Sequence, residues 1–190
     1  VQIEKTPVKS PEKKINPWFL IQVYKSCKLA LKYPHLLLAI LASAYFSFTA
    51  SFTYLNMIPL GIQSLHITDV QTGYVFLAAA LGIGIGSVIV ALASGKNVEL
   101  GLSIIGAIGT TISYFIIYIF DTNIIIVTLM ILSLGVHGGL FVVPLDAYIQ
   151  IASPDKDRGE IVAAGAFLGF LGVMISALAL GLFSHILHLS

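Results

Sequence analysis

The sequence predicts an all-α membrane protein with five transmembrane helices, because it is very apolar and contains five long uncharged stretches. Of the 190 residues, 57% are hydrophobic and 10% are charged, whereas soluble domains carry about 45–50% apolar and about 25% charged residues. A helix needs about 20 apolar residues to cross a bilayer, and these stretches lack the alternation of membrane strands. The predicted spans are residues 36–60, 74–94, 100–120, 124–145 and 161–183.

Composition and residue spacing exclude several other classes of protein. A net charge of +1 is too low for a nucleic-acid partner, and Cys27, the single cysteine, has no partner for a disulfide within the chain. No second histidine or cysteine lies at ligand spacing from His137, so we expect no metal and no other cofactor. The spans contain no Ser-His-Asp, Cys-His or paired-carboxylate arrangement, so this segment is not expected to be an enzyme.

The region before the first span divides into a linker and an amphipathic helix. Residues 1–15 contain Lys, Glu and Pro with little apolar content and are typical of a cytoplasmic linker. Residues 16–33 are predicted to form an interfacial helix, capped by Asn16, with Pro17 at its first position. The alternative is a cytoplasmic helix that packs on a partner domain. The predicted apolar face is Phe19, Leu20, Val23, Tyr24, Cys27, Ala30 and Leu31, and the opposite face carries Lys25, Lys28 and Lys32.

The positions of the positive charges predict the orientation. All ten lysine and arginine residues fall on one side of the predicted membrane, and cytoplasmic segments retain such charges during insertion. The N-terminal segment is therefore predicted to be cytoplasmic, and residues 34–190 to form a transmembrane half-bundle. The chain begins with Val1 and stops at Ser190, soon after the fifth span, so we expect a fragment of a longer chain.

Glycines spaced four residues apart predict close helix packing. Gly82 and Gly86 form a GxxxG pair in the second span, and Gly165 and Gly169 form another in the fifth span, followed by Gly172. Small residues at this spacing let two helix backbones approach each other in a membrane. The alternative is a sliding contact that opens and closes during transport.

Polar and aromatic residues in the first and fourth spans are candidates for the wall of a substrate cavity. Hydroxyl groups recur every four residues on the first span, beside an aromatic row; the residues are Ser43, Ser47, Ser51, Phe48 and Phe52. The alternative is that these hydroxyls bond to backbone carbonyls and assist packing. His137 is the only deeply placed ionisable residue, and it either faces a cavity or lies hydrogen-bonded in a packed core.

The cytoplasmic end of the fourth span is a candidate gate. Pro144 is predicted to kink the helix. Asp146 follows close to the membrane surface, where we expect it to pair with Lys156 or Arg158 of the next loop. A latch is favoured over proton chemistry, because these expected partners are cationic.

Three stretches carry a resemblance to a known family: GIGIGSVIVALASGKNVELGL (82–102), GGLFVVPLDAYIQ (138–150) and SPDKDRGEIVAAGAFLGFLG (153–172). They resemble the major facilitator superfamily and, within it, the bacterial lysophospholipid transporters that are often fused to acyltransferase and acyl-carrier-protein synthetase domains. The resemblance covers residues 16–183. It implies that the five spans are helices seven to eleven of a C-terminal half, with an N-terminal six-helix half and a last helix as partners.

The same resemblance implies roles for residues in the cytoplasmic loops. Lys96 lies where the superfamily has a charged loop motif between helices eight and nine, which is degenerate here. Arg158 and Gly159 match the loop between helices ten and eleven, whose arginine helps to latch the cytoplasmic gate. Relatives usually have asparagine at the position of Asp146, so the carboxylate departs from the family pattern.

By this resemblance, the expected function is movement of lysophospholipid, typically of the ethanolamine type, from the outer to the inner leaflet of the bacterial inner membrane. An acyltransferase, fused or associated, then restores the missing acyl chain. Two alternatives stay open: a facilitator that exports drugs or metabolites, and a membrane anchor for a fused acyltransferase.

Overall fold

A computed structural model describes residues 19–33, 35–95 and 97–186, and this part of the chain is built from helices without strands. Five segments are long and apolar enough to cross a membrane, which confirms the predicted fold class. The predicted linker, residues 16–18 and Lys96 lie outside the described residues. The helices are α1 (Phe19–Ala30), α2 (Leu36–Pro59), the π-helical turn η1 (Leu60–Ser64), α3 (Asp69–Ser94), α4 (Gly101–Ile119), α5 (Ile124–Ala152) and α6 (Arg158–Ile186).

Three helices, α3, α5 and α6, extend beyond the uncharged stretches, and α6 does so by starting at Arg158. α3 begins at Asp69, because Thr68 and Gln71 form a capping box in which each side chain bonds to the other residue's backbone N–H. α5 runs through Pro144 and ends only at Ala152. Asp146 therefore lies on a continuous helix, two turns before its end.

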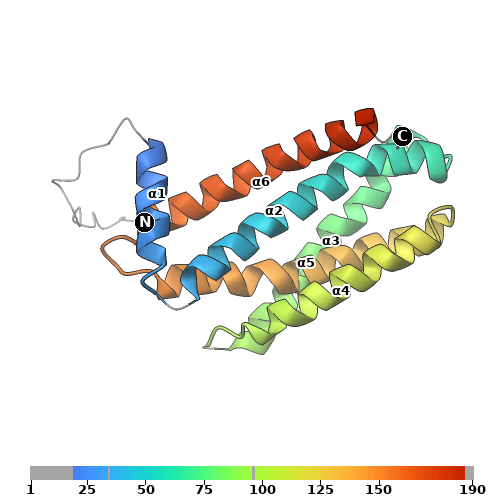
Figure 1. Cartoon of the computed structure of the whole chain (residues 1–190). Coiled ribbons are helices and arrows are strands. Elements are labelled where there is room, and N and C mark those ends of the chain that lie inside the picture. Colours follow the sequence, from blue (N-terminus) through green and yellow to red (C-terminus); the bar gives the residue numbers. More distant parts are fainter. Residues whose placement is uncertain (1–18, 34, 96, 187–190) are drawn as a thin grey trace, which may run out of the picture.

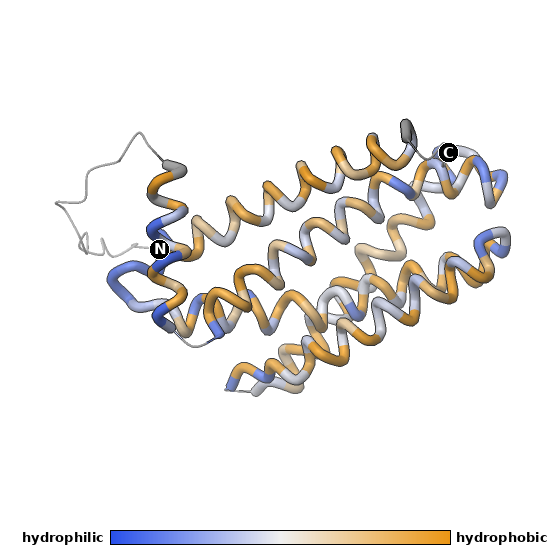
Figure 2. The backbone as a smooth tube through the Cα atoms, viewed as in Figure 1, coloured by the Kyte–Doolittle hydropathy of each residue, from blue (hydrophilic) through white to orange (hydrophobic). Residues whose placement is uncertain are grey.

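α5 is the centre of the bundle (Figure 1). α3, α4 and α2 pack against it, whereas α6 packs mainly on α2. Hydrophilic residues gather at the two ends of the bundle, and the helices between them are largely hydrophobic (Figure 2). Many large side chains along the helices are exposed, such as Leu92 at 80% and Phe170 at 74%. This distribution suits helices surrounded by lipid, which solvates apolar side chains as well as a protein core does.

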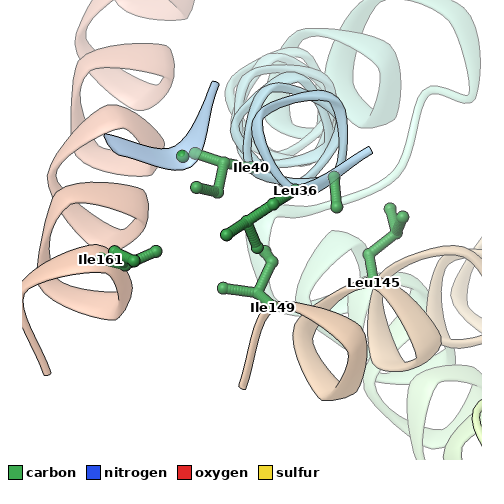
Figure 3. Packing of buried hydrophobic residues seen from close by; sticks show 7 residues of the cluster. Leu36, Ile40, Leu145, Ile149 and Ile161 are labelled. Atoms are coloured by element: carbon green, nitrogen blue, oxygen red, sulfur yellow. The ribbon is translucent and has the colours of Figure 1, made fainter. Parts of the chain in front are cut away.

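Two buried clusters connect the helices. One joins α2, α5 and α6 near the start of α2 through Leu36, Ile40, Leu145, Ile149 and Ile161 (Figure 3). The other joins the far end of α2 to α3 and α5 through Met57, Val75, Val127, Ile131 and Leu134. Between the clusters, the space along α2 is only partly filled.

α1 lies across the ends of α2 and α6 instead of running along them (Figure 1). Ser26 and Ala30 are its buried residues, at 3% and 0% exposure. Tyr24 and Leu31 of the predicted apolar face are 67% and 66% exposed, as an apolar face turned toward lipid would be, and the assignment of this face stays a prediction. Contact between this exposed side and lipid headgroups stays a prediction.

Candidate functional site: two pockets beside α2

Two pockets lie beside α2 and share no lining residue. The first, which we call the Asp146 pocket, has a volume of about 390 Å³ and lies between α2, α5 and α6. The second, which we call the Tyr114 pocket, has a volume of about 320 Å³ and lies between α2, α3, α4 and α5. Successive residues of a helix point in different directions. Ser43 and Ser47 therefore line the first pocket, and Tyr45 and Thr49 line the second.

The Asp146 pocket combines one polar wall with one apolar wall. Ser43 Oγ donates a hydrogen bond of 2.9 Å to Asp146 Oδ1, and Ser47 Oγ donates one of 3.2 Å to the Ser43 carbonyl. Gln150 lies one turn beyond Asp146 on the same helix. The remaining lining comes mainly from α6: Val162, Gly165, Ala166, Gly169, Phe170 and Val173, with Ile149 from α5. Such a pocket can hold a polar group against the carboxylate and an apolar group against α6.

Three of the predicted cavity residues lie elsewhere. Ser51 lies at the α2–α6 interface, where Ser176 Oγ donates a 2.7 Å hydrogen bond to its hydroxyl oxygen. Phe48 and Phe52 stack on each other with ring centroids 6.0 Å apart, and neither ring lines the Asp146 pocket or the Tyr114 pocket. Ser51 has left the row that lines the Asp146 pocket, because positions four residues apart turn gradually around the helix. The place of these three residues in a substrate cavity stays a prediction.

His137 also lies away from both pockets. Its Nδ1 lies 2.9 Å from the Ser133 carbonyl oxygen and 3.1 Å from the Ser133 hydroxyl, which in turn contacts the hydroxyl of Ser113 on α4 at 2.9 Å. The imidazole ring fills the space above Gly109, where a Cβ atom would overlap it. Of the two readings of this residue, the structure therefore supports the packed, hydrogen-bonded histidine. A role of His137 in the substrate cavity stays a prediction.

The expected ion pair between Asp146 and Arg158 is replaced by a local one. Arg158 Nη2 lies 2.6 Å from Asp155 Oδ1 and also bonds to the Ser153 carbonyl at 3.4 Å. Asp155 lies in the short segment between α5 and α6, three residues before Arg158. Asp146 instead accepts its hydrogen bond from Ser43. A Cβ at Gly159 would meet nothing within 4 Å. The prediction that Asp146 pairs with Lys156 or Arg158 was therefore wrong.

The glycines divide into close contacts and open positions. Cβ atoms at Gly82 and Gly86 would overlap backbone carbonyls of α5, at Leu132 and Val136. Gly135 lies opposite Gly82 and would overlap the Ala79 carbonyl in the same way. A Cβ at Gly165 would lie 3.8 Å from Ile40, which is an ordinary contact. The prediction of close backbone packing at this position was therefore wrong.

On α6, Gly172 is the tightest of the glycine positions that were expected to pack closely. A Cβ at Gly172 would lie 2.6 Å from the Ala44 carbonyl, whereas one at Gly169 would lie 3.1 Å from the Ser47 hydroxyl. Gly172 is three residues after Gly169, and the i+3 neighbour shares a helix face as the i+4 neighbour does.

The α4 side of the Tyr114 pocket was not predicted from the sequence. The lining of this pocket combines hydroxyl groups with aromatic rings from four helices. The hydroxyl residues are Tyr45, Thr49, Thr53, Thr110, Thr111 and Tyr114, and the rings include Phe46, Phe76 and Phe141. The available signal was the run of Thr110, Thr111 and Tyr114, which places polar groups on neighbouring faces of an otherwise apolar span.

A bundle of five helices, each long and apolar enough to cross a bilayer, indicates an integral membrane protein. The described residues contain no group of three histidine, cysteine or acidic side chains arranged to hold a metal ion. The sequence profile of the Major Facilitator Superfamily matches residues 3–177. The chain therefore belongs to this family. The segment is accordingly a transporter domain and not an enzyme. Neither a curated protein nor a solved structure matches the chain.

Proposed function

We propose that this chain is part of a transporter that moves lysophospholipid of the ethanolamine type from the outer to the inner leaflet of a bacterial inner membrane, with its N-terminal segment in the cytoplasm. The observation that carries the proposal is the Asp146 pocket. Its polar wall and its apolar wall match the two parts of a single-chain phospholipid.

The chemistry of the polar wall favours an ammonium headgroup. The Asp146 carboxylate is held by the hydrogen bond from Ser43 and leaves further acceptor positions toward the pocket. A primary ammonium supplies three donors and a positive charge. The ethanolamine group of lysophosphatidylethanolamine carries such an ammonium, whereas the glycerol group of lysophosphatidylglycerol does not.

The apolar wall favours a substrate that keeps its tail in apolar surroundings. Phe170 and Val173 of α6 line the pocket and are 74% and 41% exposed, so the pocket continues onto the apolar outer surface of the helix. The acyl chain then remains against apolar surface while the headgroup crosses, and the main barrier is desolvation of the headgroup. Alternating access would occur between this half and a second six-helix half with the last helix. Reacylation belongs to a fused or associated acyltransferase.

The test is uptake of headgroup-labelled lysophosphatidylethanolamine by cells that express the complete reading frame containing this chain. We expect lysolipid uptake above background and no uptake of a pool of soluble drugs and sugars. In the Asp146→Asn variant, we expect the preference for lysophosphatidylethanolamine over lysophosphatidylglycerol to fall about two- to fivefold. This is the effect of losing an exposed ion pair worth up to about 1 kcal/mol.

Asp121→Asn is the matched control, because Asp121 lies in the α4–α5 loop and lines neither pocket. It should leave the headgroup preference unchanged. Transport of the soluble pool without lysolipid would favour a general facilitator of drugs or metabolites. Absence of any transport by a well-expressed protein would favour a membrane anchor for an acyltransferase.

A further inference from the structure

Five of the six hydroxyl groups that line the Tyr114 pocket, all except that of Tyr45, donate their protons to acceptors within the protein. Thr53 donates its single proton to the Thr49 carbonyl at 2.8 Å, so Tyr114 must be the donor in its contact with Thr53 Oγ1. Thr49 in turn donates to the Phe46 carbonyl at 3.0 Å. The oxygen lone pairs of these side chains remain as acceptors.

The facing helix repeats this arrangement. Thr110 and Thr111 each donate a hydrogen bond of 2.9 Å to the Ala107 carbonyl. Their protons are therefore also used within the helix, while their oxygen atoms line the pocket. Both hydroxyl-bearing walls thus offer acceptors, and an acceptor-rich site selects a ligand that donates.

The rest of the lining determines what kind of molecule carries that donor. Phe46 and Phe141 are neighbouring rings with centroids 6.0 Å apart, and Phe76 lies on the α3 side. Aromatic walls favour stacking or edge contacts with a ring. No charged side chain lines the pocket, so a full charge would lose hydration without gaining a counter-charge. The volume of about 320 Å³ lies within the range of about 300–1,000 Å³ for small-molecule sites.

We infer that the Tyr114 pocket is a second binding site, which takes a neutral, ring-containing small molecule through a hydrogen bond that the ligand donates. This site does not depend on the lysophospholipid proposal, because the two pockets share no lining residue. Its occupancy can therefore be tested by binding, without any transport assay.

The probe is 1-naphthol, a neutral bicyclic ring with one hydroxyl donor. Its binding to the complete protein in lipid nanodiscs is measured by calorimetric titration, against empty nanodiscs. 1-Methoxynaphthalene, which has the same rings without a donor, serves as the matched ligand. We expect saturable binding of 1-naphthol and at least tenfold weaker binding of the methoxy compound. Unsaturable partitioning of 1-naphthol, or equal affinity for both compounds, would overturn the inference.

Two exposed alanines provide matched filling variants. Ala50 lines the Tyr114 pocket and Ala166 lines the Asp146 pocket. We expect Ala50→Trp to reduce 1-naphthol affinity more than tenfold and Ala166→Trp to leave it unchanged. An equal loss in both variants, or no loss in either, would contradict the assignment to this pocket.

Thr111→Val keeps the inference testable if Ala50→Trp does not fold. Valine has nearly the shape of threonine, and Thr111 is exposed, so the substitution removes an acceptor oxygen with little change in packing. We expect a three- to tenfold loss of 1-naphthol affinity and no change for 1-methoxynaphthalene. Unchanged discrimination between the two compounds in Thr111→Val would count against the donated hydrogen bond.

Discussion

Ser43 and Asp146, 103 positions apart in the sequence, are joined by a hydrogen bond of 2.9 Å from the serine hydroxyl to the carboxylate. This bond connects α2 to the end of α5 inside the Asp146 pocket. It takes the place of the expected cationic partner, so the carboxylate is held by a neutral donor. A group held in this way keeps its charge available for a ligand.

Removal of this bond should loosen the contact between α2 and α5. We expect Ser43→Ala to lower the free energy of unfolding by about 0.5–1.5 kcal/mol, the range for hydrogen bonds between membrane helices. Ser47→Ala is the control, because Ser47 donates to a carbonyl of its own helix. Thermal unfolding in detergent gives both values, and equal destabilisation by the two variants would show that the interhelical bond contributes nothing.

The close contact at Gly86 should not tolerate a side chain. A Cβ there would overlap the Val136 carbonyl of α5, whereas one at Gly84, on the same helix, would meet nothing within 4 Å. We therefore expect Gly86→Leu to reduce the folded, monodisperse yield severalfold and Gly84→Leu to leave it near that of the native protein. Size-exclusion chromatography in detergent checks this. A normal yield of Gly86→Leu would contradict the packing geometry.

Gly109 and His137 should behave as a complementary pair. A Cβ at Gly109 would overlap the imidazole ring, so we expect Gly109→Ala to destabilise the protein by about 1–3 kcal/mol. In the His137→Ala background, the same substitution should cost much less, because the ring is gone. Gly101→Ala, at the open start of α4, is the neutral control. Additive effects of the two substitutions in a double-mutant cycle would contradict this arrangement.

Arg158 should couple to Asp155 and not to Asp146. The side chains of Arg158 and Asp155 are 43% and 72% exposed, and exposed ion pairs contribute about 0–1 kcal/mol. A thermal-unfolding double-mutant cycle of Arg158→Ala with Asp155→Ala should therefore give a small favourable coupling. The corresponding cycle of Arg158→Ala with Asp146→Ala should give no coupling energy. A larger coupling of Arg158 to Asp146 than to Asp155 would support the predicted latch between Arg158 and Asp146 instead.

Cys27 provides a pH-dependent test of α1 packing. Burial raises the pKa of the Cys27 thiol above its usual range, and only the thiolate reacts with alkylating reagents. The folded protein therefore holds less thiolate than the denatured protein at a given pH. We expect iodoacetamide labelling of the native protein to reach half its maximal rate at a higher pH. Coincident pH profiles of the native and denatured protein would show that α1 does not shield this thiol.

The number of spans, their helical nature and most of their positions follow from the sequence. Lipid offers no hydrogen bonds to the backbone, so an uncharged stretch of bilayer length must form a helix that satisfies its own polar groups. Gly82 and Gly86 indicated a packing face from the sequence alone, because only a residue without a side chain lets two helix backbones come into contact. Their partners on α5, around Gly135, were not identified, because one helix does not reveal which face of another it meets.

Which residues line a pocket depends on the rotation of each helix against its neighbours. Four residues turn an α-helix by about 400°, so a row such as Ser43, Ser47 and Ser51 drifts by about 40° at each step. The first two serines face the Asp146 pocket, and the third has turned to Ser176 of α6. His137 faces Gly109 for a similar reason, since Gly109 of α4 leaves space for the ring, while Ser133 of its own helix supplies the hydrogen bonds. Local sequence therefore defines each helix, whereas contacts between helices determine which of its faces bounds an open space.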